Sequence, residues 1–465
     1  MNAETTDFVA LTTELLGNFQ QLCDEPTICE SAQQLQAFEE KVEEMAARLR
    51  GLVIGQTIQA SIDSPAVRAE AKQKVLLHPK KMRNQGLRPV TLELCGGVTL
   101  RIWLTYYSRS STSAAKGRGI FPALGVLGII ARHTPAAVQR IVQMISLTSS
   151  YQEARELLTE HGETSCVNTL RRIARQFAAG VRQAQLSGIG VLSGNVAGRN
   201  VVVSIDGGRL RIRKDRKART KKGRRRYRTD WREPKLLIIY VVDEHGRMDR
   251  SFAPITGGTL QGPDHAFALL NYYLSKLNVS SASGVLFVAD GAAWIWKRAG
   301  SLLRSLGVPA EKQFQLIDFF HASEYLGKIA ESKGKWTATE RKHWFRTQRR
   351  RLLRGEIGAV LEAIGEAIGE RPTKDQKRWR AYFGRHGQQE GRMAYSHIEA
   401  NKLPIGSGAI ESAIRRIINL RLKGASIFWT EESAEALLLL RAWQKTGRAQ
   451  DLYNNALAGS YALEF

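Results

Sequence analysis

Two apolar runs, each ending in an aspartate followed by glycine, constrain the fold of this chain more than any other feature. The first run, NVVVSIDGG, ends with Asp206, and the second, GVLFVADG, ends with Asp290. Short apolar runs rich in β-branched residues and bounded by turn residues are typical of buried strands. A glycine beside the carboxylate permits close approach of backbone and substrate. The two runs therefore predict buried strands that present a carboxylate at their ends.

The segments around these runs follow a defined order. KLLIIYVVDE, RMDRSFAPIT and FQLIDFF are also expected to form strands, and helices are expected from Pro263 to about 277 and over about 292–306. Three antiparallel strands followed by helix, strand, helix and strand is the order of a ribonuclease H-like domain. In that order the first and fourth strands are neighbours, so Asp206 and Asp290 are expected to face each other.

A third carboxylate, Glu411, stands in the first turns of a predicted helix after the GSG turn at 406–408 and is expected to complete the cluster. Clustered carboxylates raise one another's pKa unless a cation intervenes. Mg²⁺ prefers such oxygen ligands, and two ions about 3.5–4 Å apart activate the attacking oxygen and stabilise the leaving one. The alternative is that Asp206 and Asp290 merely end strands or form turns.

The N-terminal part is expected to be helical over 1–75. Within it, 32–49 alternates charged and apolar residues at helical spacing, which fits a solvated helix or a dimer-forming helix. The segment 89–107 alternates β-branched and aromatic residues with polar ones on both sides of Gly96-Gly97, which predicts a β-hairpin.

The segment 149–177 predicts two helices and a turn. Ser149 or Ser150 is expected to cap the first helix, Gly162 to supply the turn, and Thr164 or Ser165 to cap the second. The second helix is basic and polar on one side, through Asn168, Arg171, Arg172 and Arg175. Such a pair is typical of a DNA-binding helix-turn-helix, and an ordinary helical hairpin is the alternative.

The composition points to a polyanionic partner. The 465 residues include 69 Lys and Arg against 44 Asp and Glu, a formal charge of +25. The longest apolar run, around 236–242, is far below the roughly 20 residues that span a bilayer, and no N-terminal signal is expected. Cysteines lack the paired spacing of a zinc site and are expected to be free thiols in a cytoplasmic protein. They are Cys23, Cys29, Cys95 and Cys166.

Positive charge is densest between the first and second predicted strands, where 209–235 holds 15 Lys or Arg against three acids. A loop this charged is self-repelling and is expected to be flexible in the free protein, neutralising phosphates when it lies beside DNA. Tyr227 and Trp231 offer stacking surfaces, and a solvated loop is the alternative. The expected DNA contacts are Arg211, Arg213, Lys214, Arg216, Lys217, Lys221, Lys222, Arg224, Arg225, Arg226 and Arg228. A further 16 basic residues against seven acids lie in 333–392, where an arginine-rich helix is expected to hold DNA.

The sequence predicts an α+β multidomain chain. Its expected parts are an N-terminal helical region at 1–88, a β-hairpin segment at 89–119, a helical domain with the helix-turn-helix at 120–185, a glycine-rich linker at 186–199, the first part of a ribonuclease H-like α/β domain at 200–331, an all-helical insertion at 332–398, and the rest of that domain with C-terminal helices at 399–465.

Several motifs between about 195 and 445 resemble the catalytic domain of bacterial insertion-sequence DDE transposases with an all-helical insertion. SIDGG resembles the first Asp motif of that family, VADGAAWIW the second and PIGSGAIES the Glu motif, with 84 residues from Asp206 to Asp290 and 121 from Asp290 to Glu411. DFFH, with Asp318 and His321, is similar to the D/CxxH motif after the fifth strand, and LRLKGASIFWTEESAEALLLLRA resembles the family's C-terminal segment. Zinc-ribbon-like cysteines, which such relatives often carry near the N-terminal hairpin, are missing from this sequence.

The resemblance implies a transposase that cuts double-stranded DNA at the terminal inverted repeats of an element and joins the 3′-hydroxyls to target DNA. Asp206, Asp290 and Glu411 are implied to hold two Mg²⁺ ions, or Mn²⁺, with Asp318 and His321 in support. Handling two DNA ends implies a homodimer or a larger assembly. The expected location is the cytoplasm of a bacterium, in association with the nucleoid. The alternatives are another ribonuclease H-like nuclease and a transposase-derived DNA-binding protein without catalysis.

Overall fold

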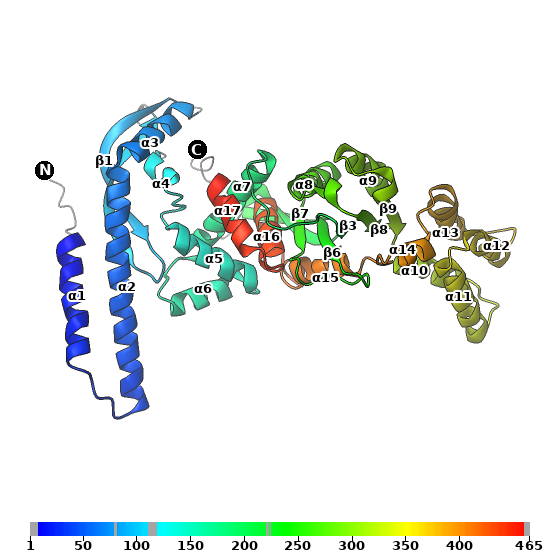
Figure 1. The fold of residues 1–465 in the computed structure, drawn as a ribbon, viewed down its shortest axis with the longest axis horizontal. Helices are drawn as coiled ribbons and strands as arrows, with labels where there is room; N and C mark the ends of the chain where they lie inside the picture. Colours follow the sequence, from blue (N-terminus) through cyan, green and yellow to red (C-terminus); the bar gives the residue numbers. More distant parts are fainter. Residues whose placement is uncertain (1–7, 79–80, 110–118, 220–222, 224, 460–465) are drawn as a thin grey trace. The chain divides into compact units, whose positions relative to one another are not determined.

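The computed structural model describes residues 8–78, 81–109, 119–219, 223 and 225–459 (Figure 1). The chain divides into two compact units, Met1–Gly190 with Tyr453–Phe465, and Val191–Leu452. Within the described ranges, no helix combines the length and the apolar character needed to cross a membrane.

The first unit begins with three helices and a β-hairpin. Helices α1 (Phe8–Asp24), α2 (Ala32–Asp63) and α3 (Pro65–Leu77) precede strands β1 (Met82–Glu93) and β2 (Thr99–Arg109). The strands pair antiparallel, and Gly96 and Gly97 form the turn with φ of +84° and +75°. The predicted hairpin is therefore confirmed, as is the helical character of the described residues before it.

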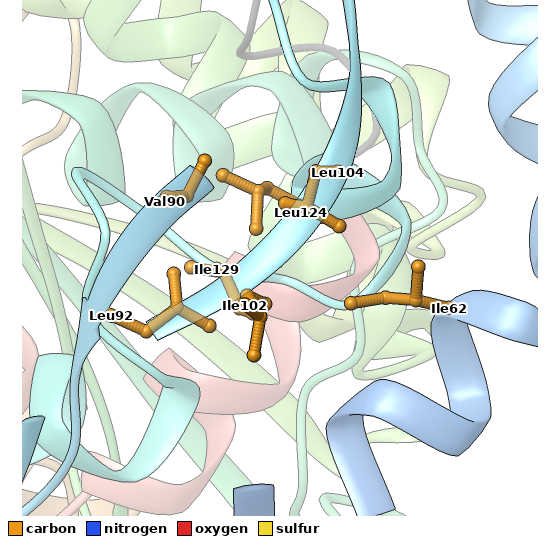
Figure 2. Close-up of a cluster of buried hydrophobic side chains, with 7 residues drawn as sticks. All are labelled: Ile62, Val90, Leu92, Ile102, Leu104, Leu124 and Ile129. Carbon is orange, nitrogen blue, oxygen red and sulfur yellow. The ribbon is translucent and has the colours of Figure 1, made fainter. Parts of the chain in front are cut away.

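One face of this hairpin supplies a core of the first unit. Side chains at alternate positions of a strand point to the same face, so the alternation in the sequence gathers apolar side chains on one side. Figure 2 shows the cluster that they form with α2, with α4 (Pro122–Val126) and with the segment after α4. Its members are Ile62, Val90, Leu92, Ile102, Leu104, Leu124 and Ile129.

The predicted helix pair follows α5 (Pro135–Leu147) and consists of α6 (Tyr151–Glu160) and α7 (Val167–Leu186). Ser150 caps α6 by accepting the backbone N–H of Glu153 at 2.9 Å, and Gly162 turns with a φ of +81°. The predicted cap of the second helix is wrong. Cys166 takes the N-cap position, with its Sγ 3.4 Å from the Thr169 hydroxyl, while the Ser165 hydroxyl lies 2.9 Å from the ring of His133.

The second unit is built on a five-stranded sheet in the order β7-β6-β3-β8-β9. The central strand β3 (Asn200–Gly207) pairs antiparallel with β6 (Lys235–Val242) and parallel with β8 (Gly284–Ala289), while β7 (Ile255–Thr259) and β9 (Gln313–Ile317) form the edges. The predicted pairing of the first and fourth sheet strands is confirmed. The third strand starts at 255 rather than 247, because Asp249 accepts the backbone N–H of Ser251 in a turn and Pro254 has no N–H for a ladder.

Helices cover both faces of the sheet. A Cβ added to Gly257 of β7 would lie 2.8 Å from the ring of Tyr273 on α8 (Pro263–Lys276). The neighbouring Thr256 donates instead to the carbonyl of Ala442 on α16 (Glu431–Gln444). Because adjacent strand residues point to opposite faces, α8 and α16 lie on opposite sides of the sheet.

The remaining helices follow the sheet strands in sequence. Helix α9 (Ala293–Ser305) connects β8 and β9, and α10 (Phe319–Glu331) follows β9. The expected helical segment then consists of α11 (Ala338–Leu353), α12 (Ile357–Ile368), α13 (Lys374–Phe383), the π-helical η3 (Gly384–Gln389) and α14 (Tyr395–Ala400). The helix expected to carry Glu411 is α15 (Gly408–Ile414), continued by the π-helical η4 (Arg415–Asn419), and the last is α17 (Ala449–Gly459).

The basic segment after β3 is a second hairpin, formed by β4 (Leu210–Arg219) and β5 (Arg225–Arg232). The prediction of a self-repelling loop is therefore wrong for these strands. Cross-strand contacts offset the repulsion, since Lys214 pairs with Asp230 at 3.0 Å and Arg213 stacks over the Tyr227 ring. Backbone hydrogen bonds between Trp429 and β4 fix the hairpin to the segment before α16. Of the predicted contacts, Lys221, Lys222 and Arg224 and the side chains of Lys217 and Arg225 lie outside the described residues.

Candidate active site

The structure places Asp206 and Asp290 side by side. Ser204 of β3 pairs with Val288 of β8 in a parallel ladder, and each aspartate follows two residues later. Matching positions on neighbouring strands are about 4.8 Å apart and point to the same face. Both carboxylates therefore stand at the carboxyl edge of the sheet, where open α/β sheets bind their ligands.

The surroundings of Asp206 disfavour its negative charge. Burial, together with the negative charge of Asp290, raises the pKa of Asp206 to about 6. The backbone N–H of Gly207, 2.6 Å from the Asp206 Oδ1, lowers the pKa of Asp206, and so does the charge of His321. These influences show that Asp290 and His321 both lie near Asp206. The pair favours binding of a proton or a cation.

Each carboxylate keeps one oxygen available. Asp206 uses Oδ1 for Gly207, and Asp290 uses Oδ1 for the backbone N–H of Ala292 at 2.9 Å. The carbonyl of Asp290 accepts the indole N–H of Trp296 at 2.7 Å, which fixes the start of α9 beneath it. In the described part of the chain, the second oxygen of neither carboxylate has a hydrogen-bond donor. Those two oxygens suit a divalent cation such as Mg²⁺.

Asp318, predicted to support catalysis, extends this row of carboxylates by one strand. Ala289 pairs with Ile317, so Asp318 is level with Asp290. It is only 2% exposed, and protein donors occupy both oxygens. Oδ1 accepts the N–H of His321 at 2.9 Å, and Oδ2 accepts the N–H of Ser407 at 2.6 Å and the Ser407 hydroxyl. Asp318 therefore caps α10 and ties it to Ser407, the N-cap residue of α15.

Glu411 lies in the first turn of α15 and is exposed. The helix packs against β3 and β6. A Cβ on Gly208 would lie 2.6 Å from Ile418 in the following π-helical segment. Among the residues that the structure describes, no three His, Cys, Asp or Glu side chains gather closely enough to hold a metal ion. The structure thus brings Asp206, Asp290 and His321 together and carries Glu411 on an adjoining helix, without forming the three-carboxylate cluster.

Two residues that sequence analysis missed close the site from the helical insertion. A Cβ on Gly291, directly after Asp290, would lie 2.3 Å from the ring of Tyr382 and 3.1 Å from Nε2 of His386. Burial raises the pKa of Tyr382 far above its usual range, and its buried hydroxyl has no hydrogen-bond partner in the described part of the protein. Burial lowers the pKa of His386, whose Nδ1 contacts Glu390 at 2.9 Å. The available signal was an aromatic residue and a histidine four positions apart, on one helical face.

The glycines after the two aspartates have a different role from the predicted one, which was close approach of backbone and substrate. In the structure, the position of a Cβ on Gly207 is taken by Glu233 and that on Gly291 by Tyr382. Gly406, in the predicted turn before Glu411, likewise leaves its Cβ position to Phe320. These glycines admit protein side chains.

The predicted recognition helix presents one continuous polar face. Leu170, Ile173, Ala174 and Phe177 are buried, whereas the predicted DNA-contacting residues of α7 are exposed. Arg171 donates to the side chain of Asn168 at 3.3 Å and stacks over the Tyr151 ring. The exposed set is Asn168, Arg171, Arg172 and Arg175.

Comparisons with known proteins add little to this geometry. No family model matches the chain, and no curated protein matches it. Among solved structures, the chain is similar to one described as the Drosophila P element transposase strand transfer complex, at 10% identity over 68% of this chain and 80% of that chain, with a TM-score of 0.24. A superposition this loose assigns neither fold nor function, which therefore rest on the site itself.

Proposed function

We propose that the protein is a DDE-type DNA transposase whose second unit is a ribonuclease H-like domain interrupted by a helical insertion. The observation that carries the proposal is the in-register pair Asp206 and Asp290 at the carboxyl ends of two adjacent parallel strands. The strand order β7-β6-β3-β8-β9, in which only β6 runs antiparallel to the other four strands, supports the fold assignment.

The carboxylate pair fits a divalent metal site, Mg²⁺ or Mn²⁺. Asp206 and Asp290 each offer an unoccupied oxygen, and burial with mutual repulsion disfavours the pair without a cation. Glu411 would join them from the first turn of α15. Such ions, when bound, activate a water or hydroxyl and stabilise the oxygen that leaves phosphorus.

Other residues of this chain hold that arrangement in place. Asp318 fixes the start of α15 through Ser407, and so orients Glu411. His321, in the first turn of α10, lies close enough to Asp206 to influence it and stacks edge-on against Tyr325. Tyr382 and His386 fill the space beside Gly291, directly after Asp290.

Double-stranded DNA is the proposed substrate, handled by at least two copies of the chain. The exposed face of α7 is suited to reading base edges, and the β4–β5 hairpin to contacting phosphates. The hairpin follows β3 directly, so its arginines begin three residues after Asp206, at Arg209.

A strand-transfer assay tests this function. The full-length protein, Mg²⁺ and a duplex carrying the DNA that borders the gene are incubated with a supercoiled plasmid, and joined products are sequenced. Insertion of the duplex ends into the plasmid is the expected result. Cleavage without joining would indicate another ribonuclease H-like nuclease, and binding without cleavage would indicate a transposase-derived DNA-binding protein.

A further inference from the structure

A cleft between the helical insertion and the segments that flank it lies outside the carboxylate site. Its volume is about 610 Å³, and it is formed by the start of α10, the second half of α11 and the segment before α15. Clefts of roughly 300–1,000 Å³ suit small ligands or single groups of a larger one. The lining residues are Phe319, Phe320, Phe345, Arg346, Arg349, Arg350, Leu353 and Ile405.

One wall of the cleft is strongly cationic. Arg346, Arg349 and Arg350 occupy positions i, i+3 and i+4 of α11, so they share one helix face. All three are exposed, and no carboxylate in the described ranges forms an ion pair with any of them. Arg349 stacks over the Phe319 ring at 5.0 Å, which orients its guanidinium at the cleft. Three unneutralised arginines on one face suit the phosphates of an anionic ligand.

The opposite wall is aromatic. Phe320 remains 55% exposed although it follows the buried Phe319. Its ring edge occupies the space beside Gly406, and Phe319 donates its N–H to the carbonyl of Ile405 at 3.0 Å. An exposed aromatic ring facing arginines offers a stacking platform next to phosphate-binding groups, the combination used by proteins that bind single strands.

We infer that this cleft binds an unpaired strand of DNA, with a base stacked on Phe320 and phosphates held by Arg346, Arg349 and Arg350. The inference rests on the proposed function and extends it. In a duplex the faces of the bases are stacked on one another and cannot reach Phe320, so a strand must be unpaired to use the cleft. Ile405 stands six residues before Glu411, and Asp318, at the start of α10, accepts the N–H of Ser407 at the start of α15. The cleft would therefore hold a strand separated near the cut.

The test measures binding of single-stranded oligonucleotides by the full-length protein without divalent metal, so that its outcome does not depend on cleavage. The probe is a strand of about ten nucleotides, within the usual site size, carrying 2-aminopurine. Stacking on Phe320 should quench its fluorescence. Phe320→Leu should weaken binding about 5- to 150-fold and abolish the quenching, and Phe320→Trp should restore both.

Charge variants test the other wall. Arg346→Gln with Arg349→Gln should flatten the log–log salt dependence of single-strand binding by about 1.4, because each phosphate that is no longer neutralised removes about 0.7 from the slope. The matched control, Lys374→Gln with Lys377→Gln on α13, removes the same charge from exposed positions that do not line the cleft, and should leave single-strand binding unchanged. Thermal unfolding midpoints of all variants, compared with wild type, establish that the fold is intact.

Three results would overturn the inference. The first is that Phe320→Leu weakens the binding of single-stranded and duplex DNA equally. The second is an unchanged salt dependence of single-strand binding in the arginine variant. The third is binding of a deoxynucleoside monophosphate as tight as that of the oligonucleotide, which would make the cleft a free-nucleotide site. Failure of strand transfer with intact cleft binding would overturn the proposed function alone.

Discussion

The surroundings of Asp206 differ from those of an ordinary surface carboxylate. Asp206 ends a strand in which every preceding residue from Val201 to Ile205 is buried, and it faces a second carboxylate. The folded protein thus binds a proton at Asp206 more tightly than the unfolded chain does, with a pKa of about 6 against an ordinary value of 3.8. The free energy of unfolding should therefore depend on pH between these two values.

The neutral variant Asp206→Asn should therefore be more stable than the wild type at pH 7. Asp206 destabilises the fold when charged, and the penalty is relieved as the pH falls from 6 to below 4. The expected gain at pH 7 is about 1–3 kcal/mol, because one pH unit of pKa difference corresponds to about 1.4 kcal/mol. Unfolding midpoints at pH 7 and pH 4 provide the measurement. A gain that persists undiminished at pH 4 would show that charge is not the cause.

Asp318 acts through α15, and its substitution should separate positioning from metal binding. Asp318→Asn replaces one acceptor oxygen by an amide that cannot accept the Ser407 N–H and hydroxyl, and should cost about 1–3 kcal/mol of stability. We expect a lower kcat with an unchanged dependence on Mg²⁺ concentration. Ser407→Ala, which keeps the backbone N–H, should have a smaller effect of the same kind. A higher Mg²⁺ requirement in Asp318→Asn would mean that Asp318 ligates the metal.

At the level of elements, the proposed function divides DNA contact between the β4–β5 hairpin and helix α7. Arginines lie over the aromatic rings of the hairpin: Arg211 and the preceding Arg209 lie near Trp231, and Arg213 lies over Tyr227. Contacts of this kind bind phosphates and carry little sequence information.

Neutralising Arg216, Arg226 and Arg228 to Gln should weaken binding to all duplexes alike. The log–log salt dependence should flatten by about 2–3, since each neutralised phosphate contributes about 0.9. The control removes equal charge at Lys41, Arg48 and Lys72, which are exposed on α2 and α3. An unchanged salt dependence would leave the hairpin a solvated surface, and weaker binding confined to one sequence would show that it reads bases.

Helix α7 is expected to supply the sequence preference. Replacing Asn168, Arg171 and Arg172 with Ala should reduce discrimination between the DNA that borders the gene and random DNA, by about 1–3 kcal/mol for each base that is no longer read. Gln183→Ala, at an exposed position near the end of the same helix, is the control. Equal binding of both DNAs by the wild type would remove the recognition role.

The hairpin and α7 also show what local sequence can and cannot reveal. The apolar period of α7 and the Gly162 turn follow from short-range chemistry, and both were predictable. The strands β4 and β5 were not, because their pairing depends on Asp215, Asp230 and the distant Trp429, which offset the repulsion that the composition suggests.

For the whole molecule, the sheet and its carboxylate pair were predictable because buried strands have a recognisable composition and Asp206 and Asp290 end two of them. Interactions between residues far apart in the chain were not predictable, such as the hydrogen bond from the Ser407 N–H to Asp318 that links α10 to α15. The insertion residues behind Gly291 were missed for the same reason, since nothing near Asp290 in the sequence points to Tyr382.

Cleavage of DNA is the measurement closest to the central claim, that Asp206 and Asp290 hold divalent metal for phosphodiester chemistry. Full-length wild type, Asp206→Asn, Asp290→Asn and Glu411→Gln are compared on a duplex carrying the DNA that borders the gene, with and without Mg²⁺, and binding is measured in parallel. We expect Mg²⁺-dependent cleavage by the wild type and a decrease of at least about 100-fold in each variant, with binding retained. Cleavage at near-wild-type rate by Asp206→Asn or Asp290→Asn would contradict the account; the same result for Glu411→Gln alone would remove only the third carboxylate.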